Sequence, residues 1–167
     1  EGVYTIDYEG FEKAIVDNDV KMYILCSPHN PAGRVWKEEE LERMLEICAR
    51  HNVLVISDEI HQDLVFGGHK HIPAATIAGG KYADRMITAF ASSKTFNLAT
   101  CLTSTIVIEN EELRKIWDDF TKVYNQVEVN VFGITAVEAA LRGGEEWYQS
   151  IKKVICANYE TVVEEMK

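Results

Sequence analysis

The chain has 167 residues, with 17 Lys and Arg against 27 Asp and Glu, so its formal net charge at pH 7 is −10. This acidic excess argues against a binding surface for nucleic acid or for an anionic membrane. A hydrophobic fraction of 47% with 26% charged residues is typical of one globular domain and excludes disorder as the overall state. The longest apolar runs have the length of strands, so no transmembrane segment is predicted.

Four short apolar runs predict β-strands. The first, 22–26, stops before Ser27-Pro28, because proline cannot donate to a strand ladder. The second, 53–57, is apolar on both faces, which is typical of a strand covered on both sides in a parallel sheet, and it delivers Asp58 at its C-terminal end. The remaining two runs are 86–90 and 104–108.

Apolar residues at helical spacing predict helices between and after these strands. A helix is expected over about 37–51, with glutamates in its first turn and basic residues in its last. Asn110 is the predicted N-cap of another helix, whose apolar stripe includes Trp117 and Phe120 and is interpreted as core. Two more helices are predicted, at about 131–141 and from Trp147 to the end of the chain.

The alternation of strands and helices predicts an α/β fold with an open, mostly parallel sheet and helices on both faces. In such a sheet, ligands bind at the C-terminal ends of the strands. Three polar segments follow predicted strands, at 27–34, 58–63 and 91–97. Neither GxGxxG nor GxxxxGK[ST] occurs, so no dinucleotide or nucleoside triphosphate site is predicted.

The residue types in these segments favour covalent carbonyl chemistry. Lys94 follows two serines at a strand end, and a desolvated lysine amine can form a Schiff base with a carbonyl. Asp58 follows another strand, and a carboxylate beneath a pyridine ring keeps the ring nitrogen protonated, so that the ring withdraws electrons from a substrate carbanion. These are the requirements of pyridoxal 5'-phosphate (PLP).

Three motifs, in this order, resemble those of fold-type I PLP enzymes of aminotransferase class I/II: 27–36 (SPHNPAGRVW), 57–61 (SDEIH) and 92–99 (SSKTFNLA). They are most similar to the cystathionine β-lyase (C–S lyase) branch, which includes the bacterial maltose-regulon modulator. The resemblance covers nearly the whole chain and implies that 1–167 is the central part of the PLP-binding large domain. Family members are much longer, so it also implies a fragment from which the N-terminal segment and the C-terminal small domain are absent.

The resemblance implies roles for named residues. Lys94 would hold the cofactor covalently and act as the proton shuttle of catalysis. Asp58 would pair with the pyridinium nitrogen. Asn30 would hydrogen-bond the cofactor's 3-oxygen, in a turn shaped by Pro31 and Gly33.

Three further residues are implied to contact the cofactor. His61 stands where many aminotransferases have a tyrosine on the 3-oxygen, and Ser93, with Ser92, would bind the phosphate. The chain departs from the family pattern at Thr100, where a glycine is usual, and this change is expected to alter the loop after the lysine.

Plainer interpretations remain open for some of these residues. Lys94 alone resembles an exposed turn lysine, and Asp58 resembles a helix N-cap. Asn30 and Gly33 are typical turn residues, which is compatible with a cofactor contact.

No metal site is predicted. Three histidines and one aspartate between 61 and 71 match no metal-ligand spacing: His61, Asp63, His69 and His71. The four cysteines are far apart and form no CxxC pair, which indicates neither a zinc site nor a disulfide network.

The first functional hypothesis is a PLP-dependent β-lyase that converts a cystathionine-like amino acid into a thiol, pyruvate and ammonia. The alternative is an aminotransferase that uses the same residues. Two further hypotheses are a regulatory protein that binds a transcription factor and a fragment that is inactive by itself. The expected partners are a small amino-acid substrate and, for the parent protein, a second copy in a homodimer, and the expected location is the cytoplasm.

Overall fold

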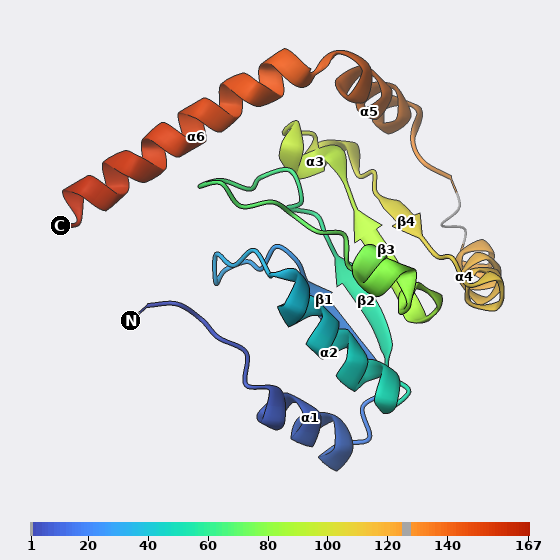
Figure 1. Ribbon diagram of the computed structural model, residues 1–167. Helices are drawn as coiled ribbons and strands as arrows, with labels where there is room; N and C mark the ends of the chain where they lie inside the picture. Colours follow the sequence, from blue (N-terminus) through green and yellow to red (C-terminus); the bar gives the residue numbers. More distant parts are fainter. Residues whose placement is uncertain (1, 125–127) are drawn as a thin grey trace.

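The computed structural model describes residues 2–124 and 128–167. Its helices and strands follow in this order (Figure 1): α1 Tyr8–Asp17, β1 Met22–Cys26, α2 Glu38–Arg50, β2 Leu54–Asp58, β3 Met86–Phe90, α3 Ser92–Thr95, β4 Thr105–Val107, α4 Glu111–Val123, α5 Val131–Gly143 and α6 Glu145–Glu165. Short 3₁₀ turns are η1 Ala74–Gly80, η2 Ala83–Arg85 and η3 Ala99–Cys101.

The four strands form one sheet in the order β1-β2-β3-β4. β1, β2 and β3 are parallel, whereas β4 pairs antiparallel with β3, so the predicted mostly parallel α/β fold is confirmed. In the register, Cys26 lies beside Asp58, and Asp58 lies beside Ala89. The C-terminal ends of the three parallel strands therefore lie side by side at one end of the sheet.

The largest core lies on one face of the sheet, beneath α1 and α2. The buried apolar face of α2 packs there, with Leu41 fully buried and Leu45 2% exposed. On the opposite face, Ile87 and Ile108 are 6% exposed, whereas Ile24 of β1 is 65% exposed. Both faces thus carry apolar side chains, but the second face is open at β1.

Sequence patterns located most elements to within one or two residues. The strand predicted at 53–57 spans Leu54–Asp58, so Asp58 is the last residue of β2, and the strand predicted at 104–108 is Thr105–Val107. Helix α1 was not predicted, although Asp7 caps it by accepting a hydrogen bond from the Gly10 N–H at 2.9 Å.

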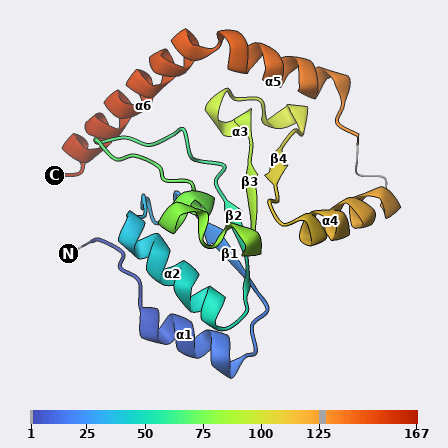
Figure 2. The same cartoon turned by 45° about the vertical axis from the view of Figure 1, so that its right-hand side comes forward.

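Helix α4 begins at its predicted cap, because Asn110 Oδ1 accepts from the Leu113 N–H at 2.9 Å. Its apolar stripe, however, is not core in this chain, since Trp117 and Phe120 are 36% and 59% exposed. Helix α4 follows the edge strand β4 and lies at the margin of the sheet (Figures 1 and 2). At that margin the described residues leave the stripe largely uncovered.

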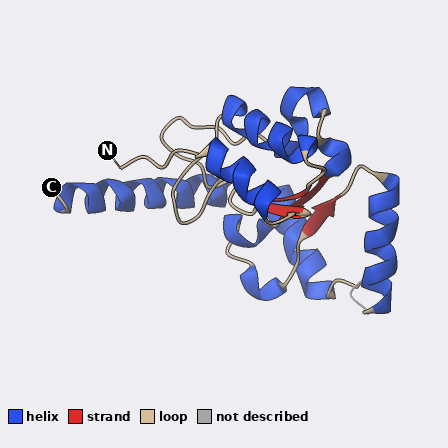
Figure 3. Ribbon diagram, turned by 90° about the horizontal axis from the view of Figure 1, so that it is seen from below, coloured by secondary structure: helices blue, strands red, loops and turns tan. Residues whose placement is uncertain are grey.

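Helix α6 extends from the rest of the molecule, as the view from below shows (Figure 3). Its first turn nevertheless contacts the residues that follow β3. A Cβ added at Gly144, just before α6, would lie 2.5 Å from Phe96 Cε1, so this position requires glycine. Among the helices in the described part of the chain, none is long and apolar enough to cross a membrane.

Candidate functional site

The three polar segments leave the sheet at the same end. The Ser27 N–H donates to the Asp58 carbonyl at 2.9 Å, and the Glu59 N–H donates to the Ala89 carbonyl at 2.8 Å. These bonds continue the β1-β2 and β2-β3 ladders to the last residues of the strands. The segments that carry Asn30, Asp58 and Lys94 therefore start from neighbouring points, as expected for a ligand site in a parallel sheet.

Asn30 lies in a tight turn with its side chain exposed. The His29 N–H donates to the Arg34 carbonyl at 2.7 Å, and the Gly33 N–H donates to the His29 carbonyl at 2.9 Å. Gly33 has φ +64°, a left-handed conformation that glycine adopts without a steric penalty. The Asn30 carboxamide makes no hydrogen bond with the described residues, so it can serve a ligand.

An ion pair fixes this turn to the start of α2. Arg34 Nη2 donates to both carboxylate oxygens of Glu40 at 2.7 and 2.8 Å, and the guanidinium carbon of Arg34 lies 4.7 Å from the ring centre of Trp36. Glu40 also accepts from the Lys37 N–H at 2.9 Å. Burial alone would raise the pKa of Glu40, but the hydrogen bonds from Lys37 and Arg34 outweigh it and lower that pKa.

Asp58 is half-buried at the end of β2. Its Oδ1 accepts a 3.2 Å hydrogen bond from the Ile60 N–H. The next residues form turns rather than a helix, so the interpretation of Asp58 as a helix N-cap is wrong. Its second carboxylate oxygen has no hydrogen bond within the described residues and can bind a ligand.

His61 lies in these turns and has an unsatisfied polar atom. Its Nδ1 is buried and has no hydrogen-bond partner among the described residues. A buried polar nitrogen without a partner costs free energy, which a polar atom of a bound group would recover. This orphaned nitrogen, close in sequence to Asp58, fits a cofactor with an oxygen substituent.

Lys94 lies in the single helical turn α3 directly after β3. The turn is closed by the Phe96 N–H on the Ser92 carbonyl and by the Leu98 N–H on the Ser93 carbonyl, both at 2.9 Å. The Lys94 side chain is exposed and forms no ion pair in the described part of the chain. The hydroxyls of Ser92 and Ser93 are half-buried and donate to no described acceptor, so all three groups are available to a ligand.

Glu59 is a buried residue of this region that the sequence patterns did not identify. It is 1% exposed and accepts from Ser57 Oγ and from the Ala74 N–H, both at 2.9 Å, while His71 Nε2 lies 2.9 Å from its other oxygen. Its position after an apolar strand was the signal that could have identified it, because a carboxylate there needs partners. Glu59 holds the long connection after β2 in place beside Asp58.

Two of the residues between 61 and 71, Asp63 and His71, have separate partners. Asp63 accepts from Thr95 Oγ1 at 2.8 Å, whereas His71 pairs with Glu59. No group of three or more His, Cys, Asp or Glu side chains that could hold a metal is found among residues 2–124 and 128–167.

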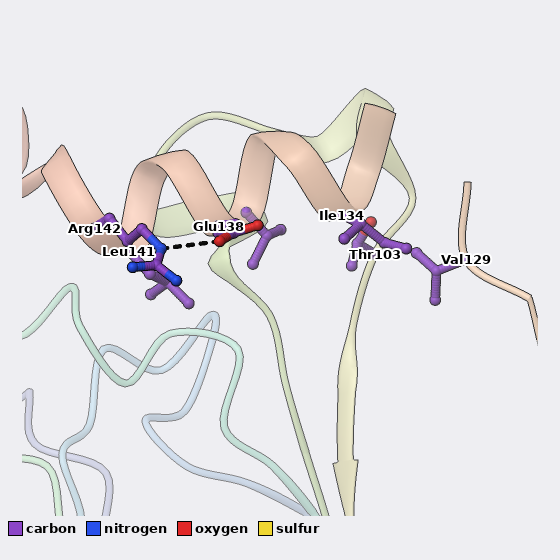
Figure 4. A pocket seen from close by; sticks show the side chains of 7 residues that line it. Thr103, Val129, Ile134, Glu138, Leu141 and Arg142 are labelled. Atoms are coloured by element: carbon purple, nitrogen blue, oxygen red, sulfur yellow. Dashed lines mark hydrogen bonds and ion pairs between the residues drawn. The ribbon is translucent and has the colours of Figure 1, made fainter. Parts of the chain in front are cut away.

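A separate hollow of about 590 Å³ lies beside α5. Figure 4 shows it lined by Thr103, by apolar side chains of α5 such as Ile134 and Leu141, and by Glu138. Glu138 accepts from Arg142 Nε at 2.9 Å. None of the side chains predicted to bind a cofactor lines this hollow, so it does not belong to the sheet-end site.

Known proteins similar to this chain include enzymes of the predicted branch. The chain is 40% identical to cystathionine β-lyase PatB of Bacillus subtilis over 90% of its own length and 39% of that protein. It superposes with a TM-score of 0.92 on a PLP-bound putative aminotransferase from Clostridium difficile 630, at 40% identity, covering 97% of this chain and 41% of the other. A PLP-bound C–S lyase from Staphylococcus hominis gives a TM-score of 0.90 at 36% identity, over 98% of this chain and 40% of that one.

The chain thus spans about 40% of the length of the relatives that it matches. The sequence profile described as aminotransferase class I and II matches residues 2–167. The chain belongs to the aminotransferase class I and II family.

Proposed function

We propose that the full-length protein is a PLP-dependent C–S β-lyase that acts on cystathionine-like amino acids, and that this chain is the central part of its cofactor-binding large domain. The observation that carries the proposal is the convergence of the Asn30, Asp58 and Lys94 segments at one end of a parallel sheet. The 40% identity to a cystathionine β-lyase supports the lyase branch.

The available side chains suit the parts of PLP. Bound PLP supplies an electron sink for negative charge at the substrate Cα. The free carboxylate oxygen of Asp58 would hold a proton on the ring nitrogen. The Asn30 carboxamide and His61 Nδ1 would hydrogen-bond the 3-oxygen.

The residues of α3 would hold the other end of the cofactor. The hydroxyls of Ser92 and Ser93 would donate to the phosphate. The Lys94 amine would anchor the cofactor covalently and would also take the proton from the substrate Cα. Loss of the thiol from Cβ, followed by hydrolysis, would give pyruvate and ammonia.

A second candidate is an aminotransferase, which would use the same side chains but return the proton to the cofactor carbon. It is supported by the similarity to the putative aminotransferase of Clostridium difficile 630. The two candidates differ in their need for a keto-acid acceptor. Lyase turnover needs none.

The test is pyruvate release from cystathionine by the full-length protein without any keto acid, with Lys94→Ala as the control. The proposal expects steady pyruvate formation by the wild type and none by the variant. Turnover that starts only when a keto acid is added would contradict the lyase proposal and support the aminotransferase.

Three other features remain predictions: the homodimer, the cytoplasmic location and the transcription-factor partner. A pull-down with the full-length protein tests the regulatory hypothesis. Retention of a transcription factor that is unaffected by Lys94→Ala would support this hypothesis, and failure to retain any partner would contradict it.

A further inference from the structure

A hydrogen bond joins the segment after Asp58 to the turn that carries Lys94. Thr95 Oγ1 donates to Asp63 Oδ2 at 2.8 Å, and Thr95 is 3% exposed. Asp63 belongs to the turns that follow β2, and Thr95 is the neighbour of Lys94 in α3. The bond therefore spans the two strand ends that the proposed function requires.

Helix α6 also supports Asp63, through its backbone carbonyl. Tyr148 Oη donates to the Asp63 backbone carbonyl at 2.5 Å, and Lys152 Nζ donates to Tyr148 Oη at 3.1 Å. The Phe96 ring lies 6.3 Å from that of Tyr148, between ring centres. Both the backbone and the carboxylate of Asp63 are thus held.

The α3 turn needs such support, because a single helical turn is not stable by itself. Successive residues of a helix point about 100° apart, so a side chain anchored at one position fixes the direction of the next. Thr95 points into the protein, toward Asp63. Lys94 is consequently directed outward, where its amine is exposed.

We propose that Asp63 is a positioning residue that fixes the direction of Lys94 relative to Asp58 by accepting the Thr95 hydroxyl hydrogen bond. The inference rests on the proposed function, because it concerns the lysine that anchors the cofactor. Asp63 acts through Thr95.

The test compares variants of the full-length protein. Thr95→Val keeps the side-chain shape but removes the donor, and Asp63→Ala removes the acceptor. Thr95→Ser keeps the hydroxyl and serves as the rescue variant. The matched control is Thr121→Val, which removes a threonine hydroxyl bonded to the Trp117 carbonyl at 3.0 Å on α4, away from the site.

Three measurements are made on each variant. The first is amide hydrogen exchange of 92–98 in the cofactor-free protein. The second is borohydride reduction with PLP, followed by peptide mass spectrometry of the Lys94 label. The third is kcat divided by the fraction of protein labelled at Lys94, which removes losses caused by incomplete folding.

Thr95→Val and Asp63→Ala are expected to accelerate exchange in 92–98 and to lower the normalised kcat by about 10- to 100-fold, the range expected when a hydrogen bond to a charged group is lost. The double variant, with Thr95→Val and Asp63→Ala together, should have a normalised kcat no lower than that of the slower single variant. Both changes remove the same hydrogen bond, so their effects should not add. Thr95→Ser and Thr121→Val should keep the wild-type exchange and kcat.

Two results would overturn the inference, and they are distinguishable. If the wild type is labelled at Lys94 but Thr95→Val and Asp63→Ala match Thr121→Val in exchange and normalised kcat, Asp63 has no positioning role and the proposed function stands. If the wild type itself takes no label at Lys94, the proposed function fails and the inference fails with it.

Discussion

Glu59 is the most deeply buried carboxylate near the sheet-end site, and it contacts two donors, Ser57 Oγ and the Ala74 N–H, together with His71 Nε2. Glu59→Ala should lower the free energy of unfolding by about 2–4 kcal/mol, because it leaves the Ser57 hydroxyl and the Ala74 N–H buried without partners. Glu59→Gln keeps an acceptor oxygen and should lower the free energy of unfolding by less than Glu59→Ala does. Urea unfolding measures both, and a Glu59→Ala variant within about 0.5 kcal/mol of wild type would refute this account of Glu59.

Cys48 should be the least reactive thiol of the chain. Burial in the core raises its pKa to about 11, and the thiolate is the reactive form. The other three cysteines are half-buried rather than buried. At pH 8, a disulfide reagent should label Cys48 at least about tenfold more slowly than Cys101. Cys48→Ala should remove only the slowest phase of the labelling reaction. Equal labelling rates at Cys48 and Cys101 would contradict the prediction.

For single residues, sequence patterns located the side chains that follow strands but not the tertiary partners of those side chains. Asp58 and Lys94 were recognisable because a polar residue after an apolar run marks a strand end. The bond between Asp63 and Thr95 was not recognisable, since it joins residues 32 positions apart whose proximity depends on the pairing of β2 with β3.

The turn of Asn30 and the start of helix α2 are one structural element held by Glu40. The lowered pKa of Glu40 means that its charged form stabilises the fold at neutral pH. That contribution is fully present above the unfolded pKa, near the ordinary value of 4.5, and is lost as pH falls through the lower folded pKa. Glu40→Gln should therefore be less stable than wild type at pH 7, by about 1–2 kcal/mol.

The difference between wild type and Glu40→Gln should shrink as the pH falls below about 4.5. Urea unfolding of both proteins from pH 7 to pH 3 measures it. A difference that stays constant over this range would show that the Glu40 charge does not stabilise the turn. Glu39→Gln is the matched control, because Glu39 is 73% exposed and its contact with Lys37 is long, at 3.9 Å.

Element types were predictable where periodicity was strong, as in α2 and in the parallel strands. Helix α1 was missed although Tyr8, Phe11 and Ile15 lie at helical spacing, because the helix has only ten residues and Gly10, a poor helix former, lies in its first turn. The burial of the α4 stripe was predicted wrongly, because amphipathic spacing shows that a helix has an apolar face but not what covers that face.

In the described part of the chain, large apolar side chains are exposed at two separate places on the molecule. Ile24 on the open side of β1 is 65% exposed and Phe120 on α4 is 59% exposed. Surfaces of this kind bind hydrophobic dyes. The chain with Ile24→Thr and Phe120→Ser should bind less of such a dye, while its free energy of unfolding changes by about 0.5 kcal/mol or less per exposed site.

Dye fluorescence and urea unfolding check this prediction, with Asp118→Asn as a control on the polar side of α4. Unchanged dye binding would mean that these two side chains are not part of the accessible apolar surface. A large loss of stability would mean that they are packed rather than exposed.

Covalent trapping of PLP on Lys94 tests directly whether the sheet-end site binds the cofactor. The full-length protein is incubated with PLP, its visible spectrum is recorded, borohydride is added, and the modified peptide is identified by mass spectrometry beside Lys94→Ala. We expect the visible band to disappear on reduction and the label to lie on Lys94, with neither change in the variant. A label on another lysine, or wild type and Lys94→Ala behaving alike, would contradict this expectation.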